Sequence, residues 1–350
     1  MTAPSTQKPY VVPVFIPHAG CPHRCIFCDQ KRTTGQREPL PTEDQIHGII
    51  SRFLGFRQNA ERRTEISFYG GNFLGLPAEQ VLTLLELGKR YVAAGLVHGL
   101  RFSTRPDSIN SDTLALISKF PVTTVELGVQ SLNNRVLKAC RRGHTAQDTH
   151  RAVSLLRSES YRLGLQMMIG LPEDTPEWSL ATGREIAALG PDFVRIYPTL
   201  VLEGSPLAQR FDQGRYVPMA LQEAVDLVCR LLALFLRNHI KVVRMGLQPT
   251  ADLNAGSGIA AGPFHPAFGE LVYSALWRSA LHKWLSTWQP GGCSIEITVH
   301  PSMLSRLRGY KNENMNWMNA RFNPSGIITS TSPDLPTDRA LINGTVCRLF

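Results

Sequence analysis

The sequence predicts an α/β protein, a partial (β/α)6-7 TIM-like barrel with a small C-terminal α+β extension. Seven apolar, β-rich runs alternate with six segments of helical period between residues 10 and 246. Strands that alternate with helices of this length indicate βα units and a parallel sheet. A doubly wound open sheet is the alternative, but no G-x-G-x-x-G segment follows the first strand. In either architecture the functional side chains belong at the carboxyl ends of the strands.

The predicted elements follow one another closely. The expected strands are residues 10–16, 65–70, 100–105, 122–130, 162–170, 192–198 and 240–246. The expected helices are residues 43–54, 78–94, 111–119, 145–159, 176–188 and 220–238. Thr42 followed by Gln45 is the pattern of a capping box at the start of the first helix. We therefore assign residues 10–250 to the barrel.

The pattern changes at about Asn254, and residues 255–350 are expected to form an accessory α+β segment. Its expected elements are a loop and long helix at 262–288, a strand at 293–299 and a helix at 301–310. The stretch from 323 to 340 is rich in Pro, Ser, Thr and Asp, a composition typical of surface loops.

The composition is that of an ordinary soluble globular protein, with 43% hydrophobic and 19% charged residues. No window reaches the roughly 18 apolar residues of a membrane helix, and the first ten residues do not read as a secretory signal. We therefore expect a cytoplasmic protein, in which clustered thiols bind metal or take part in catalysis more often than they form disulfides. The net charge of +9 suits an anionic partner such as RNA, although it does not locate a site.

Three cysteines, Cys21, Cys25 and Cys28, follow the first strand with the spacing C-x3-C-x2-C. A closed zinc site needs four ligands, and His18 or His23 would have to complete it, because no second C-x2-C pair is present. Three thiolates on a four-iron cluster would leave one iron open to a small chelating molecule. The spacing favours such a cluster, and zinc bound by three cysteines and one histidine remains the alternative.

With Phe27 the segment reads C-x3-C-x-F-C, and it resembles the signature of the radical S-adenosylmethionine (radical SAM) superfamily. The resemblance implies a [4Fe–4S] cluster on Cys21, Cys25 and Cys28, whose open iron chelates S-adenosylmethionine. It also implies an external electron donor of the flavodoxin or ferredoxin type. One-electron reduction would then cleave S-adenosylmethionine to a 5′-deoxyadenosyl radical, which abstracts hydrogen from a substrate. The protein's own part is binding, orientation and exclusion of side reactions.

Two further motifs on successive strands resemble that superfamily. "YGGNFLG" at 69–75 resembles its Gly-Gly-Glu motif, which implies that the backbone of Gly70 and Gly71 binds the methionine end, with Asn72 in place of the usual Glu. "STRPD" at 103–107 has Ser103 where two branches, the elongator-protein-like and the coproporphyrinogen-oxidase-like, usually have a Glu near the ribose.

The fourth and fifth strands resemble the same two branches. Gln130 of "ELGVQS" and, twelve residues later, Arg142 match positions that hold the ribose and the carboxylate of the cofactor in the oxidase branch. Gln166 of "LQMMIGLP" stands where that branch has an Asp beside the adenine. A solvated helix end is the alternative reading of Arg142, and His18, His23 and His144 read most simply as polar loop residues.

Substrate-side residues are expected inside the barrel. Glu126 shares one strand face with Gln130, and Arg195 shares one with Tyr197, so we interpret Glu126, Arg195 and Tyr197 as candidate catalytic residues. A structural ion pair between Glu126 and Arg195 and simple packing of Tyr197 are the alternatives. Residues 261–269 are a candidate lid over the site.

Within the superfamily, the sequence motifs "TRPD", "ELGVQS" and "LPEDT" resemble the elongator protein three family most closely. That family modifies the wobble uridine of tRNA with acetyl-CoA through a C-terminal acetyltransferase domain. The residues after Asn254 are too few for this domain, so we expect no acetyl-CoA chemistry. The other cysteines lack paired spacing, which argues against a second cluster; they are Cys140, Cys229, Cys293 and Cys347.

Three functions start from this site. RNA modification is favoured by the basic balance and by the Lys, Arg and aromatic residues of 305–322, a stretch that reads equally as a solvated amphipathic helix. Radical oxidation of a small molecule or cofactor precursor is favoured by the polar barrel interior. A non-catalytic heme- or cofactor-binding protein on the same fold is the third.

Overall fold

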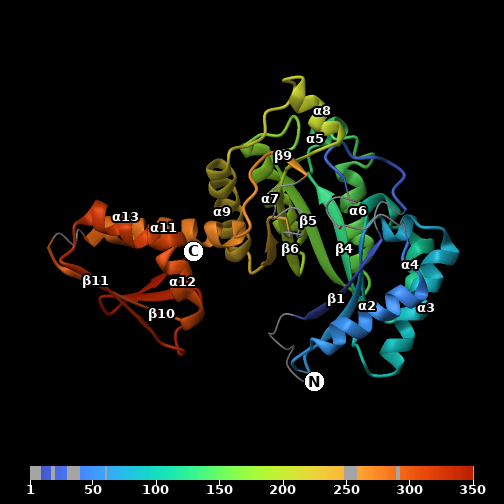
Figure 1. Cartoon of the computed structure of the whole chain (residues 1–350), viewed down its shortest axis with the longest axis horizontal. Helices are drawn as coiled ribbons and strands as arrows, with labels where there is room; N and C mark the ends of the chain where they lie inside the picture. The colour runs from blue at the N-terminus through green and yellow to red at the C-terminus, as the bar shows by residue number, and fades with distance from the viewer. Residues whose placement is uncertain are drawn as a thin grey trace.

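The computed structural model describes residues 9–16, 20–29, 40–59, 61–247, 258–288 and 292–349. Seven parallel strands form one curled sheet in the order β1-β2-β3-β4-β5-β6-β8 (Figure 1). They are β1 (Tyr10–Ile16), β2 (Thr64–Gly70), β3 (Gly99–Thr104), β4 (Val122–Gln130), β5 (Arg162–Ile169), β6 (Phe193–Pro198) and β8 (Lys241–Met245). The predicted α/β class and partial barrel are confirmed, because the first and last strands are edges of one open sheet.

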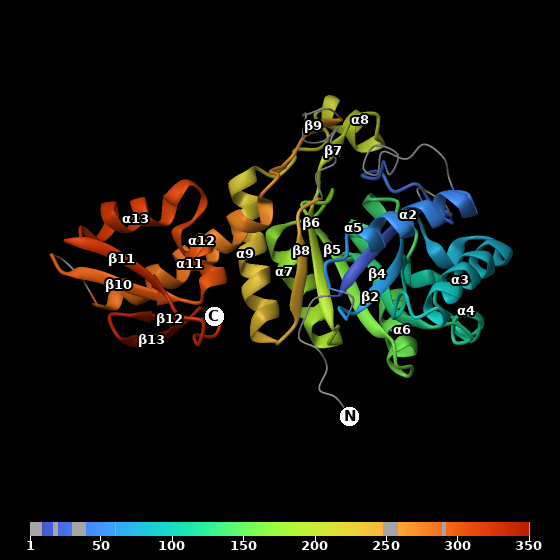
Figure 2. The same ribbon diagram turned by 60° about the horizontal axis from the view of Figure 1, so that its bottom comes forward.

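Helices connect the strands and lie outside the curled sheet (Figure 2). They are α2 (Glu43–Gly55), α3 (Ala78–Ala93), α4 (Ser111–Ile117), α5 (Asn134–Ala139), α6 (Ala146–Arg157), α7 (Pro176–Leu189), α8 (Pro206–Asp212) and α9 (Leu221–Arg237), with the short 3-10 turns η1 (Phe73–Gly75) and η2 (Pro106–Ser108). The predicted capping box is present, since Thr42 Oγ1 accepts from Gln45 N at 3.3 Å and Gln45 Oε1 from Thr42 N at 2.8 Å. Among the described residues, no helix is both long and apolar enough to cross a membrane.

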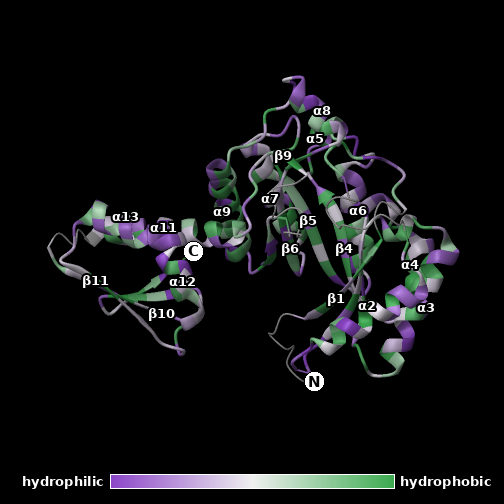
Figure 3. Ribbon diagram, in the orientation of Figure 1, coloured by the Kyte–Doolittle hydropathy of each residue, from purple (hydrophilic) through white to green (hydrophobic). Residues whose placement is uncertain are grey.

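The main core lies between the sheet and these helices. Alternate strand residues such as Val14, Phe68 and Phe102 are fully buried there, and Phe68 and Phe102 stack on Phe73 at 5.1 and 4.7 Å between ring centroids. Figure 3 accordingly shows strands that are largely hydrophobic and helices that are hydrophobic on one side only. Because neighbouring residues of a strand face opposite ways, the other face of each strand turns its side chains into the barrel.

The C-terminal part is built on a second, four-stranded sheet of order β11-β10-β12-β13. Its elements are α11 (Phe268–Trp288), β10 (Ser294–Val299), η3 (Pro301–Met303), α12 (Leu304–Arg308), η4 (Tyr310–Asn312), α13 (Glu313–Phe322), β11 (Gly326–Thr331), β12 (Arg339–Ile342) and β13 (Thr345–Arg348). Trp277, Ile297 and Met318 belong to its own hydrophobic core. Figure 2 shows this part beside α9, against which α11 packs. The proposed boundary between residues 250 and 255 falls among residues that the structure does not describe.

The structure corrects one expectation for this region and adds two elements that were not expected. The stretch 323–340 lies largely at the surface, as expected, but within it Gly326–Thr331 forms β11, in which Ile328 is exposed. Residues 305–322 do not form one amphipathic helix, because Gly309, Lys311 and Asn312 have positive φ angles of 78°, 52° and 61° that end α12. A small antiparallel pair was also not expected; it joins β7 (Val201–Leu202) to β9 (Ile259–Ala261).

Candidate functional site

The three predicted cysteine ligands lie in the loop that follows β1. Cys25 is buried, whereas Cys21 and Cys28 are partly exposed. Burial and the neighbouring Cys25 and Cys21 thiols raise the pKa of Cys28 to about 12, and burial also raises the pKa of Cys21. Three adjacent thiolates repel one another, and a coordinated metal removes this cost because its charge stabilises the deprotonated form. The donor set therefore fits a metal centre.

Two residues between the cysteines anchor the loop to distant parts of the chain. Ile26 N donates to Cys140 O at 3.2 Å, and Leu207 N donates to Ile26 O at 2.9 Å, so the loop joins the end of α5 and the start of α8. Ile26 is fully buried, and Phe27 packs against the apolar groups around Leu207 and around Val136. The cysteines thus stand on a loop that is fixed independently of any metal.

The two kinds of metal centre place their thiolate ligands differently. Zinc draws each thiolate to about 2.3 Å, whereas each thiolate of an iron–sulfur cluster binds a different iron. Among the residues that the structure describes, no three His, Cys, Asp or Glu side chains form a group that could hold one ion. Of the two candidate histidines, His18 lies outside the described residues, and the ring of His23 lies against Gly143, where an added Cβ would meet it at 2.1 Å.

The turn after β2 approaches the cysteine loop closely. Gly70 has a φ of 107°, which residues with a side chain rarely adopt. An added Cβ on Gly20 would lie 2.1 Å from the backbone oxygen of Asn72, so the start of the cysteine loop rests directly on this turn. The predicted glycines Gly70 and Gly71 therefore stand next to the predicted ligand loop.

Asn72 fastens the cysteine loop to the end of β3. Its side chain is buried, and Nδ2 donates to Gly20 O at 3.0 Å and to Ser108 Oγ at 2.8 Å. Its Oδ1 accepts from Thr104 Oγ1 at 2.6 Å and from Arg105 N at 3.0 Å. The amide donates through Nδ2 and accepts through Oδ1, whereas an ionised carboxylate only accepts, so a Glu at this position could not make the same bonds.

We expect Asn72→Asp to weaken metal retention in the cysteine loop, with at least a several-fold loss of iron per chain after reconstitution. The new carboxylate would place an acceptor against Gly20 O, at a cost of about 1–3 kcal/mol for a lost buried hydrogen bond. Asn59→Asp is the matched control, because Asn59 Oδ1 only accepts a bond from Glu61 N at 2.9 Å. Equal iron contents in the two variants would contradict the role of Asn72.

The end of β4 carries a cluster of unsatisfied polar atoms. Gln130 has a φ of 67°, and Arg142 Nη1 donates to Cys25 Sγ at 3.3 Å while its Nη2 donates to Gly128 O at 2.7 Å. In the described part of the chain, the buried atoms without a partner include Gln130 Oε1, Arg142 Nε, His144 Nδ1 and Arg105 Nη1. Each such atom costs about 1–3 kcal/mol when left unpaired. The cluster therefore fits a ligand that bears both carboxylate and hydroxyl groups.

His144 does not match the expectation of a polar loop residue. It is only 4% exposed, and burial together with Arg142 and Arg105 lowers its pKa to about 3. The imidazole is thus neutral, and Nε2 lies 3.3 Å from Val129 O, which assigns the proton to Nε2 and leaves Nδ1 as an acceptor. No local sequence pattern signals this burial, because it depends on the turn at Gly143.

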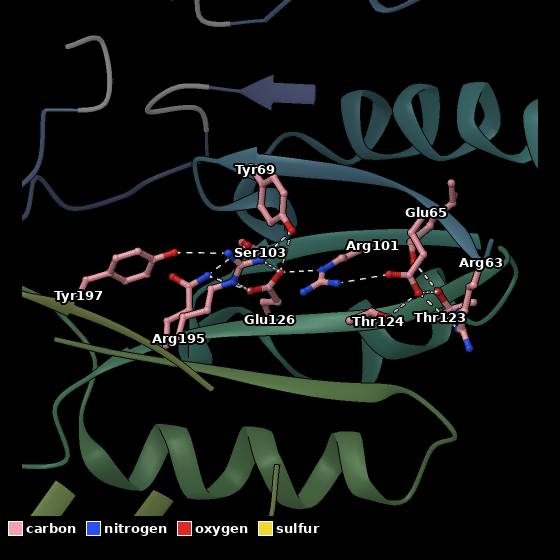
Figure 4. A network of polar contacts seen from close by, with 12 residues as sticks. Arg63, Glu65, Tyr69, Arg101, Ser103, Thr123, Thr124, Glu126, Arg195 and Tyr197 are labelled. Carbon is pink, nitrogen blue, oxygen red and sulfur yellow. Dashed lines mark hydrogen bonds and ion pairs between the residues drawn. The ribbon is translucent and has the colours of Figure 1, made fainter. Parts of the chain in front are cut away.

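A second group of predicted residues meets inside the barrel (Figure 4). Glu126 is fully buried and accepts from Arg101 Nε and Arg195 Nε, both at 2.6 Å, and from Tyr69 OH at 3.0 Å. Burial alone would raise the pKa of Glu126, but Arg195 and Arg101 lower it to about 2. The ion pair between Glu126 and Arg195 that the sequence allowed is present. A carboxylate held in this way is a poor proton acceptor, so its direct effect is to position the two guanidinium groups.

The remaining predicted residues join the same network. Gln166 Nε2 donates to Glu126 Oε2 at 3.3 Å and to Ser103 Oγ at 3.4 Å. Arg195 Nη1 donates to Tyr197 OH at 3.5 Å, and Arg195 and Tyr197 are partly exposed toward the carboxyl ends of the strands. Gln166 and Ser103, predicted beside the cofactor, therefore lie with the predicted substrate-side residues.

Sequence reasoning missed the part of this network that β2 and β3 contribute. Glu65 is fully buried, accepts from Thr123 Oγ1 and Thr124 Oγ1 at 3.0 Å, and pairs with Arg101 at 3.3 Å. Tyr69 OH accepts from Arg195 Nη2 at 3.0 Å. A signal was present, because Glu65 and Tyr69 occupy alternate positions of one strand and face the same way.

The predicted lid borders the site. Ala261 pairs with Val201, and an added Cβ on Gly262 would lie 3.0 Å from Thr199 O, just beyond β6. The segment 261–269 therefore lies at the carboxyl end of the sheet, and its movement as a lid stays a prediction.

Comparison with known proteins agrees with this geometry. The family model described as "Radical SAM superfamily" matches residues 15–182, and the model "Radical_SAM C-terminal domain" matches residues 191–278. The chain is 29% identical over 313 residues to the tRNA uridine(34) acetyltransferase of Methanocaldococcus infernus, covering 77% of this chain and 57% of that protein. It is 34% identical over 140 residues to elongator complex protein 3 of Saccharomyces cerevisiae, covering 39% and 25%.

The fold is also found among solved structures. The archaeal Elp3 of Methanocaldococcus infernus, with an N-terminal deletion, superposes with a TM-score of 0.59 and 24% identity over 80% of this chain and 63% of that one. The chain spans about half the length of the curated relatives it matches, between 47% and 57% for the tRNA uridine(34) acetyltransferases.

Proposed function

Because the chain belongs to the radical SAM superfamily, we propose that Cys21, Cys25 and Cys28 hold a [4Fe–4S] cluster beside a binding site for S-adenosylmethionine. When bound and reduced, these groups supply a 5′-deoxyadenosyl radical that abstracts hydrogen from a substrate. The observation that carries the proposal is Arg142, which touches Cys25 and keeps a buried, unpartnered Nε next to Gln130. A ligand with a carboxylate satisfies that atom.

The chain's own residues hold and orient the cofactor. Arg142 Nε donates to its carboxylate, and Gln130 Oε1 accepts from a ribose hydroxyl, because these buried atoms have no protein partner. The backbone at Gly70 and Gly71 receives the methionine amino end. Asn72 acts through the loop it fastens.

The substrate meets the inward face of the barrel. Arg195, whose side chain is 17% exposed, and Tyr197 contact it, and Glu126 fixes Arg195 in place through a 2.6 Å bond. Ser103 and Gln166 extend this network through the bonds of Gln166 to Glu126 and Ser103. The barrel, residues 10–250, carries the site, and residues 255–350 form the accessory segment.

The substrate class best supported is RNA, with a tRNA base as the site of modification. The net charge of +9 attracts a polyanion, and three of the relatives that the chain matches are named tRNA uridine(34) acetyltransferases. A cytoplasmic flavodoxin or ferredoxin supplies the electron. Acetyl-CoA plays no part in this proposal.

The experiment that tests the proposal is anaerobic reconstitution with iron and sulfide, followed by dithionite reduction in the presence of S-adenosylmethionine. We expect about four irons per chain, release of 5′-deoxyadenosine, and faster release when bulk tRNA is added, because binding of the correct substrate can drive the closure that completes a catalytic site. Bound zinc without any cleavage would contradict the cofactor assignment. Cleavage that bulk tRNA leaves unchanged would contradict RNA as the substrate.

A second candidate, radical oxidation of a small molecule or cofactor precursor, is favoured by one observation. The interior network of Glu126, Arg101 and Arg195 is polar and buried, as suits a small substrate enclosed by the barrel. The same assay separates the two, because a small-molecule extract rather than tRNA would then accelerate the release of 5′-deoxyadenosine. A bound chromophore with no cleavage would support a non-catalytic heme- or cofactor-binding protein.

A further inference from the structure

A cavity of about 1100 Å³ lies away from the cysteine loop. It is lined by residues just before β1 and β2, at the start of β5 and β6, along β8 and in the first turns of α11. Arg162 opens β5, and at about 3.3 Å per residue it stands about 23 Å from the carboxyl end of that strand. The cavity therefore follows the open edge at β8, from the amino-terminal side of the sheet to the segment 261–269.

The lining is strongly cationic. It contains two carboxylates, Asp192 and Glu270, and five cations: Arg63, Arg162, Lys241, Arg244 and Arg306. Both carboxylates are engaged, since Asp192 Oδ2 accepts from Leu163 N at 2.8 Å and Glu270 pairs with Arg306 at 3.3 Å. Arg63 pairs with Glu65. In the described part of the chain, no ion pair is formed by Arg162, Lys241 or Arg244.

Arg244 is one of the cations in the lining that have no carboxylate partner among the described residues. It is partly buried on the edge strand and is the register partner of Arg195, and its Nε donates only to the backbone oxygen of Gly246, at 3.3 Å. Burial, together with Arg195, lowers the pKa of Arg244, which still stays charged at neutral pH. A partly desolvated guanidinium beside another one is costly unless an anion compensates it.

Two of the cations in the lining also lie over its aromatic rings. Arg162 lies over the ring of Phe193 at 5.9 Å, and Arg306 lies over the ring of Tyr273 at 3.7 Å, so cations already cover both aromatic faces. Guanidinium groups present planar sets of donors that match the oxygens of phosphate. The cavity volume of about 1100 Å³ is slightly above the range of small-molecule sites, which is about 300–1000 Å³.

We propose that this cavity is a second binding site, which takes a phosphate ester through Arg162, Lys241 and Arg244. The phosphate belongs either to a free nucleotide or to the backbone of an RNA strand that passes the open edge at β8. The site is separate from the cysteine loop, so it stands whether or not the radical chemistry and the RNA substrate proposed above are correct.

The test is equilibrium binding to the 350-residue chain carrying its reconstituted cluster, with two probes measured separately. One is adenosine triphosphate and the other is a fluorescein-labelled single-stranded RNA of twelve nucleotides. The cavity variant is Arg162→Gln with Lys241→Gln. The control, Lys119→Gln with Arg230→Gln, removes the same charge from exposed positions of the barrel surface that do not line the cavity.

We expect the cavity variant to raise the Kd of at least one probe tenfold or more, and the control to leave it within about twofold. Weaker binding of the nucleotide by the cavity variant indicates that the site takes a free nucleotide. Weaker binding of the RNA alone indicates that it takes an RNA backbone. The slope of log K against log salt concentration should then be smaller by about two, because two phosphate contacts are lost. The proposal is overturned if neither probe binds, or if the cavity and control variants weaken binding equally. Retention of both probes by the cavity variant also counts against the proposal, because adenosine triphosphate resembles the adenosyl end of S-adenosylmethionine and would then occupy the cofactor site.

Discussion

Cys25→Ala is expected to abolish reductive cleavage of S-adenosylmethionine while the barrel stays folded. Cys25 is the buried member of the three cysteines and the one that Arg142 contacts at 3.3 Å. Its removal leaves one iron without a protein ligand and breaks the link between the cluster loop and the cofactor's carboxylate site. The loop keeps its course, because Ile26 and Phe27 anchor it through backbone bonds and apolar packing. Iron content, visible absorption, 5′-deoxyadenosine and thermal unfolding are the measurements.

Cys229→Ala is the matched control for this variant. Cys229 is a partly exposed residue of α9, on the outside of the barrel, and the same substitution there removes the same atom. We expect unchanged iron and unchanged cleavage in this variant. Turnover retained in Cys25→Ala would overturn the ligand assignment, and turnover lost in both variants would mean that cysteine removal disturbs folding in general.

Glu126→Gln is expected to destabilise the folded chain by about 3–5 kcal/mol, the cost of leaving buried charges without their partner. Arg101 and Arg195 both lose the Glu126 carboxylate, and Arg101 keeps only its pair with Glu65. Water does not reach the position of Glu126, which is fully buried. Anaerobic urea denaturation at neutral pH measures the effect. Glu185→Gln is the control, because Glu185 pairs with His150 on the surface, where such pairs contribute about 1 kcal/mol or less. Equal losses in the two variants would contradict the structural role of Glu126.

The natural chain and the Glu126→Gln variant can also be compared at different pH values. The pKa of Glu126 falls from an ordinary 4.5 to about 2 in the folded chain, so its stabilising contribution is present above pH 4.5 and is lost as the pH falls toward 2. The difference in unfolding free energy between the natural chain and Glu126→Gln should therefore narrow by about 2 kcal/mol between pH 6 and pH 3. A difference that stays constant over this range would show that the carboxylate is not held by its two cations.

The fold and the proximity of the cysteine loop to the glycine pair were predictable because their signals are local. Hydrophobic periodicity gave the order of strands and helices in the barrel, and the capping box of Thr42 depends on two residues three apart. The cysteine triplet and the glycine pair are likewise short motifs, and their strand ends bring them together in any parallel barrel.

What could not be predicted depends on contacts between distant residues. Glu65 meets Arg101, and Arg101 meets Glu126, only through the registers of three strands, although alternate polar residues on each strand did signal a polar interior. The burial of His144 and the break at Gly309 result from single backbone angles. In β11 the Ser and Thr residues suggested a loop, whereas they form the outer face of an edge strand.

The anchoring of the cysteine loop sets the order of events in making this protein. Ile26 is bonded to Cys140 and to Leu207, so the loop depends on residues that leave the ribosome long after it. Contacts of such long sequence separation form late in folding, because much of the chain must be ordered before they can close. The native course of the loop that carries Cys21, Cys25 and Cys28 therefore forms only after α8 has been synthesised and docked. For the proposed cluster, we expect iron and sulfide to be delivered after this step, in competition with oxidants that reach the thiols.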